Sequence, residues 1–128
     1  MIPSVNIKER TPIWIALSDF YLDTELQDSD FRYIAKTILE SPYTFDEIKS
    51  INKYEVFPVL QSNLMQPAGE WAGFNEKILI KAITDHLAAR NRINTMMISI
   101  SYARYGWMQE DYWERLEKMY TQMKKDQK

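Results

Sequence analysis

The carboxylates near the N-terminus are the side chains whose types and spacing are best suited to chemistry. Asp19 and Asp23 are four residues apart, so a helix would place both on one face, and Glu25 follows closely. Carboxylates in such a group can act as general acid and base or hold Mg²⁺. Glu55 and Glu70 are further carboxylates that could join them. One interpretation of the chain is therefore a small carboxylate-based enzyme, with or without a metal.

The other residue types argue against catalysis. A dinuclear site in a helical bundle would need a Glu-x-x-His motif, which the sequence lacks. The chain has no cysteine, and its single histidine, His86, has the apolar neighbours Ile83 and Leu87, which is typical of a core or boundary position. Ser18 and Ser41 lack the glycines of a nucleophile elbow, and there is no phosphate-binding glycine loop. We therefore predict no catalytic, cofactor-binding or metal-binding residue, and favour a protein that is not an enzyme.

Charge is distributed unevenly along the 128 residues, although the net charge is only −2. Residues 1–80 carry 7 basic and 12 acidic side chains, whereas residues 81–128 carry 9 basic and 6 acidic ones. The stretch Thr11–Phe31 contains five acids and no base. Such a stretch repels nucleic acid and attracts a basic protein. The predicted partner-binding residues are Asp19, Tyr21, Asp23, Glu25, Asp28 and Asp30.

A tryptophan between two glycines is the second candidate contact. Trp71 lies in the loop Gln66–Phe74, flanked by Gly69 and Gly73. A tryptophan in such a loop either fills the core or anchors a partner. Both alternatives stay open, and Trp71 joins the predicted partner-binding residues.

The compartment and the partner class follow from the remaining composition. The longest apolar-rich stretch, Ile93–Trp107, is too short and too polar to span a bilayer. The first ten residues do not resemble a secretory signal, and the absence of cysteine suits a reducing compartment. Basic residues are scattered rather than clustered. We therefore expect a cytoplasmic protein that binds a protein partner, and neither nucleic acid nor a membrane.

The hydrophobic spacing predicts the elements that must position these residues: one all-α domain, a compact bundle of about five to six helices. Residues 1–10 are predicted to be an arm, and residues 11–125 the domain. Thr11-Pro12 is typical of a helix start, and Thr44 with Glu47 forms a capping box. Helices are predicted at 11–21, 29–40, 45–64, 76–89, 93–105 and 109–125. Residues 98–102 alternate like a strand, but a helix is favoured because a lone strand would lack a partner.

Two segments resemble a family of small bacterial proteins known as a domain of unknown function: Trp14–Leu26 (WIALSDFYLDTEL) and Glu55–Phe74, which contains EVFPVL and NLMQPAGEWAGF. The resemblance covers about residues 12–82, and the part after Arg90 looks longer and different. It implies no catalytic residue. The small size, bacterial spread and acidic front half are similar to those of proteins that neutralise antibacterial toxins. The resulting hypothesis is an immunity-type protein that binds a toxin or effector domain. The alternatives are the carboxylate enzyme and a non-catalytic regulatory adaptor.

Overall fold

The computed structural model describes residues 6–21, 26–61 and 76–126, and every regular element in them is helical. The helices are α1 (Ile7–Ser18), α2 (Asp28–Leu39), α3 (Phe45–Ile51), α4 (Phe57–Leu60), α5 (Glu76–Ala89), α6 (Arg92–Tyr105) and α7 (Glu110–Asp126). Shorter 3₁₀ turns, η1 (Asp19–Tyr21) and η4 (Gly106–Gln109), and a π-helix, η2 (Asn52–Val56), connect some of them. The predicted all-α class is confirmed. Because α3, η2 and α4 follow one another without a break, they form one continuous helix. Counted this way, the described residues contain six long helical segments.

Helix α1 begins earlier than the sequence analysis predicts. Asn6, not Thr11, is the N-cap, and its Oδ1 accepts a hydrogen bond of 3.1 Å from the Glu9 amide. Thr11 instead donates its hydroxyl to the carbonyl of Ile7, one turn back in the helix. Residues 7–10 are therefore helical rather than part of an arm, and the remainder of the predicted arm, residues 1–5, lies outside the described residues. The missed signal is Asn6-x-x-Glu9, whose spacing is that of a capping pair.

The starts of α2 and α3 agree closely with the sequence predictions. At α3 the predicted capping box is present: the Glu47 amide donates to Thr44 Oγ1 at 3.1 Å, and the Thr44 amide donates to Glu47 Oε1 at 2.8 Å. At α2 the Gln27 amide donates to Asp30 Oδ2 at 2.7 Å. Both helices thereby satisfy backbone donors that a helix N-terminus leaves free.

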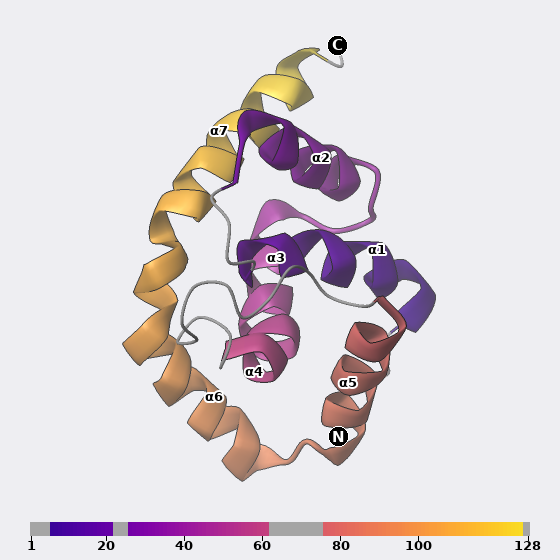
Figure 1. Cartoon of the computed structure of the whole chain (residues 1–128), viewed down its shortest axis with the longest axis vertical. Coiled ribbons are helices and arrows are strands. Elements are labelled where there is room, and N and C mark those ends of the chain that lie inside the picture. Colours follow the sequence, from indigo (N-terminus) through magenta and orange to yellow (C-terminus); the bar gives the residue numbers. More distant parts are fainter. Residues whose placement is uncertain (1–5, 22–25, 62–75, 127–128) are drawn as a thin grey trace.

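The core forms around α1, which packs against α2, α5 and η2 (Figure 1). Helices α2 and α7 pack side by side, and α6 and α7 together follow one rim of the molecule. Four aromatic residues on the apolar stripes of the sequence are buried: Trp14, Phe20, Phe31 and Trp113. The rings of Phe20 and Trp113 meet edge to face with 5.0 Å between their centroids, which joins η1 to α7.

Pro58 lies inside the helix predicted at 45–64, where the π-helix η2 directly precedes α4. Proline has no amide hydrogen to donate to the carbonyl four residues earlier. The hydrogen-bond pattern changes at Phe57, the residue before the proline. The Phe57 amide donates to the carbonyl of Asn52, five residues earlier, instead of four. The changed register turns Asn52, Glu55 and Val56 into the interior.

Residues 92–105 form α6, so the helix was the right choice over the strand. Asn91 caps it by accepting a hydrogen bond of 2.9 Å from the Asn94 amide. Gly106 is the C-cap of the helix, and its φ of −62° is that of a right-handed helix. Its small size serves a close approach instead, because a Cβ there would lie 3.0 Å from the Tyr102 ring.

Candidate protein-docking site

The predicted acidic surface is only partly assembled by the described residues. Asp19 is half-buried at the C-terminal end of α1, where burial, aided by the charge of Asp30, raises the pKa of its carboxyl to about 6. Asp28 is exposed, with its Oδ1 3.7 Å from Nη2 of Arg115, and Asp30 serves as a helix cap. Asp23 and Glu25 lie outside the described residues.

Tyr21 does not belong to a partner surface, so that prediction is wrong. Its side chain is only 1% exposed, and its hydroxyl donates a hydrogen bond of 2.7 Å to Asn52 Oδ1. Asn52 in turn donates to Gln109 Oε1 at 3.1 Å. Burial of the phenol raises the pKa of Tyr21. The residue therefore joins η1, η2 and η4 inside the core.

Glu55 is also a structural residue. Its Oε1 accepts a hydrogen bond of 2.8 Å from Trp14 Nε1, and its Oε2 is paired with the guanidinium of Arg10. Each of its carboxylate oxygens thereby has a partner within the fold. Glu70 and Trp71 lie outside the described residues. The described part of the chain contains no group of three or more histidine, aspartate or glutamate side chains placed to hold a metal ion.

His86 and Arg90 form a small basic cluster near the end of α5. Burial, aided by the charge of Arg90, lowers the pKa of His86, and burial lowers the pKa of Arg90. His86 Nε2 and two guanidinium nitrogens of Arg90 are buried without a hydrogen-bond partner. Arg90 lies over the ring of Tyr54, with 6.0 Å between its Cζ and the ring centroid. Each side chain as a whole is only half-buried, so the cluster does not enclose a site.

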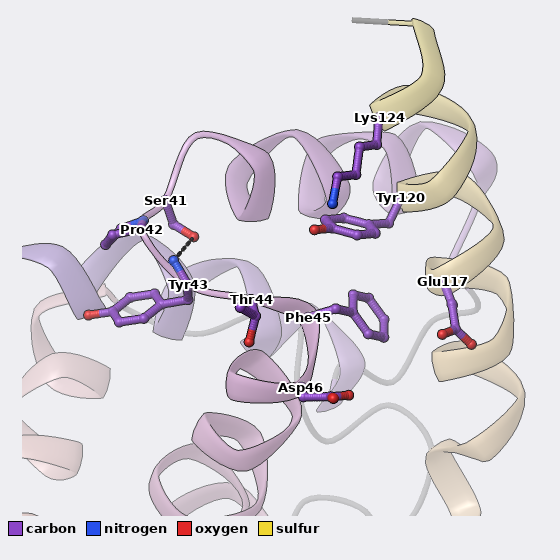
Figure 2. Close-up of a pocket in the computed structure, with 9 residues that line it drawn as sticks. All are labelled: Ser41, Pro42, Tyr43, Thr44, Phe45, Asp46, Glu117, Tyr120 and Lys124. Atoms are coloured by element: carbon purple, nitrogen blue, oxygen red, sulfur yellow. Dashed lines mark hydrogen bonds between the residues drawn. The ribbon is translucent and has the colours of Figure 1, made fainter.

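A groove of about 430 Å³ lies between α7 and the start of α3. Figure 2 shows the rings of Phe45 and Tyr120 side by side, with Asp46 and Glu117 on the two walls. The ring centroids are 5.0 Å apart. All its lining residues are at least partly exposed, and none has a buried polar atom left without a partner. The groove is a shallow surface feature without the enclosed polar groups of a ligand site.

The outer face of α6 is the exposed surface that stands out. Four large apolar side chains on it are 60–68% exposed, and Trp107 at 69% and Met108 at 40% follow on η4. The four on α6 recur at intervals of three, four and seven residues, which places them on one side of the helix. Large apolar side chains gathered at a surface in this way typically mark an interaction site. The outer apolar face comprises Ile93, Met96, Met97, Ile100, Trp107 and Met108.

The inner side of α6 fixes this face in place. Ile98 is buried, and the hydroxyls of Ser99 and Tyr54 lie 3.3 Å apart across the contact with η2. The rings of Tyr102 and Phe57 pack edge to face, with 5.0 Å between their centroids. The helix is therefore anchored by one side while the other side presents the apolar face to solvent.

The sequence analysis missed this face because α6 is apolar on both sides. Ile98, Tyr102 and Tyr105 form an inner stripe, and the outer stripe is interleaved with it. The available signal was the number of large apolar residues, which exceeds what one buried side of a helix can use.

The fold and this face together define an all-α protein with a group of exposed apolar side chains along α6 and η4. The chain belongs to the family described as a domain of unknown function (DUF7079), whose model matches residues 8–119. The match extends well beyond residues 12–82 and includes α6 and much of α7, so the C-terminal third is not foreign to the family. No curated protein and no solved structure matches the chain. Within the described residues, no helix combines the length and apolarity needed to cross a membrane.

Proposed function

We propose that this chain acts by binding another protein through the outer apolar face of α6. The exposure of that face is the observation that carries the proposal. Methionine, tryptophan and arginine are enriched in protein interfaces, and the face and its edges combine all three. Methionine also adapts its shape to a partner at low cost. Large apolar side chains gathered at a surface are costly unless they are used.

The partner that we propose is a toxin or effector domain, which the chain neutralises by contact in the cytoplasm. A neutralising protein needs a rigid surface and no chemistry of its own. The packing of α6 against η2 supplies the rigidity. The engagement of Glu55 by Arg10 and Trp14 favours binding over the carboxylate enzyme, because it removes one of the proposed catalytic groups.

The test is neutralisation in a host cell. A toxin domain encoded beside this gene is expressed with and without the full chain, and growth is measured. We expect growth to stop with the toxin alone and to resume with the chain. The variant Ile100→Asp should lose protection, whereas Ile7→Asp on α1 should keep it, since Ile7 is another exposed isoleucine, at 42% against 63% for Ile100. Neighbouring genes that encode only metabolic enzymes, or a toxin that kills despite the chain, would contradict the proposal.

A further inference from the structure

A positive charge lies within the outer apolar face. On α6, Arg104 follows Ile100 by four residues and Met97 by seven, so it shares their side of the helix. Arg104 is exposed, with its guanidinium 5.5 Å from the ring centroid of its neighbour Tyr105. Among the described residues it forms no ion pair.

We propose that the partner presents a carboxylate opposite Arg104 within an otherwise apolar surface, an inference that rests on the proposed function. A partner that covers the apolar side chains also removes water from the guanidinium of Arg104, which lies on the same side of α6. A buried charge is costly unless an opposite charge and hydrogen bonds replace the water. Arginine presents a planar fork of donors that a carboxylate matches with two hydrogen bonds. The partner's acid therefore supplies both specificity and the missing hydrogen bonds.

A second copy of the chain meets this requirement less well. The face itself, residues 93–108, contains Arg104 but no aspartate or glutamate, and the nearest acids, Glu110 and Asp111, lie beyond its end in the first turn of α7. A symmetric dimer uses the same patch on both subunits. Pairing two such faces would place Arg104 among apolar side chains, with acids only at the edge of the contact. The charge pattern thus favours a different protein as the occupant.

An anionic membrane suits the face less well than a protein does. Recognition of anionic lipid by a helix typically uses about four to eight basic residues. Only Arg90, Arg92 and Arg104 lie near this face, and Arg90 is half-buried against Tyr54. The three methionines are instead typical of a protein interface.

The proposed carboxylate on the partner also indicates which part of the partner's surface the chain contacts. A toxin that acts on nucleic acid needs a basic cleft. A surface that pairs with Arg104 is apolar and locally acidic, so it lies away from such a cleft. The chain would then inhibit by holding the toxin in an inactive arrangement or by blocking access from its edge.

The experiment begins with site-specific photo-crosslinking in the protein's own cells. The full chain carries benzoylphenylalanine at position 97 or 100, or at the control position 81, which is exposed on α5. The crosslinked peptide is identified by mass spectrometry. We expect positions 97 and 100 to crosslink to one apolar segment of a different protein that contains aspartate or glutamate, and position 81 not to.

Charge reversal then tests the proposed pair, with the purified partner as the probe. Arg104→Glu should weaken binding at least about 30-fold, and reversing the contacted partner acid to arginine should restore it. Arg32→Glu, at an exposed position of α2, should change affinity less than about twofold. Crosslinking only to lipid or only to a second copy, or no crosslink at all, overturns both this inference and the docking function. A protein crosslink on a segment without an acid, or unchanged binding by Arg104→Glu, overturns the carboxylate alone.

Discussion

Trp14 and Glu55 meet in the core although they are 41 residues apart in the chain: the indole Nε1 donates a hydrogen bond of 2.8 Å to Glu55 Oε1. The other carboxylate oxygen is paired with Arg10, from the first turns of α1. Both contacts depend on η2, whose π-helical register turns Glu55 inward. The carboxylate of Glu55 thus links α1 to the continuous helix formed by α3, η2 and α4.

Replacing Glu55 should therefore destabilise the fold. We expect Glu55→Ala to cost about 3–5 kcal/mol, because Arg10 and Trp14 would be left with unpaired buried donors. Glu55→Gln should cost less, since an amide oxygen can still accept from Trp14. Urea unfolding followed by circular dichroism measures both. An unchanged midpoint for Glu55→Ala would contradict the structural role, and loss of an enzymatic activity in a stable variant would favour the carboxylate enzyme.

The hydroxyl of Tyr21 should stabilise the core rather than a complex. Tyr21→Phe is expected to lower the free energy of unfolding by about 1–2 kcal/mol, because Asn52 loses its donor in a buried site. Partner affinity should stay unchanged. A variant of full stability that binds the partner more weakly would return Tyr21 to the interface.

Asp19 should make stability depend on pH. Because its pKa in the folded chain is raised to about 6, the fold favours the protonated carboxyl. Its stabilising contribution is present below about pH 4, the ordinary range of an aspartate, and is lost as the pH rises through about 6. We expect Asp19→Asn to be more stable than the parent at pH 7.5, by up to about 1 kcal/mol, since a carboxylate also repels the negative end of α1.

Thermal unfolding at several pH values measures this difference. The two proteins should have nearly the same stability at pH 4 and diverge above it. A variant that is less stable than the parent at pH 7.5 would show that the charged carboxylate has a favourable partner.

Two tryptophans near the start of α7 should separate stability from binding. Trp113 is 6% exposed and Trp107 is 69% exposed. Trp113→Ala should cost about 3–5 kcal/mol of stability, as for other buried aromatic residues. Trp107→Ala should change stability by less than about 0.5 kcal/mol, but weaken partner binding by about 2 kcal/mol. Calorimetry of unfolding and of binding tests both, and a Trp107→Ala variant with normal affinity would count against the docking face.

Local signals were sufficient to predict much of the fold. The Thr44–Glu47 capping box, Pro42 after α2 and the apolar spacing of α2 and α7 are features of short segments, and the structure keeps them. The core aromatic residues followed from the same spacing. The start of α1 was missed because Thr11-Pro12 competed with the less familiar pair Asn6 and Glu9.

Features that depend on contacts between residues distant in the sequence could not be predicted. The sequence pattern suggests Glu55 for a carboxylate site and Tyr21 for a partner surface, yet partners distant in sequence bind both inside the core. The outer apolar face could not be predicted from the sequence for a related reason. Only the packing of Ile98, Tyr102 and Tyr105 toward η2 and the core shows which side of α6 is left in solvent.

The most direct test of the outer apolar face is the methionine methyl NMR spectrum of the full chain. It is recorded with and without the purified partner that crosslinking identifies. Met96, Met97 and Met108 lie on the face, whereas Met119 and Met123 pack partly against the core from α7 and serve as internal controls. We predict that the first three methyl signals shift or broaden on binding and that the two control signals stay in place. Saturating binding that leaves the three face signals unchanged would contradict the account.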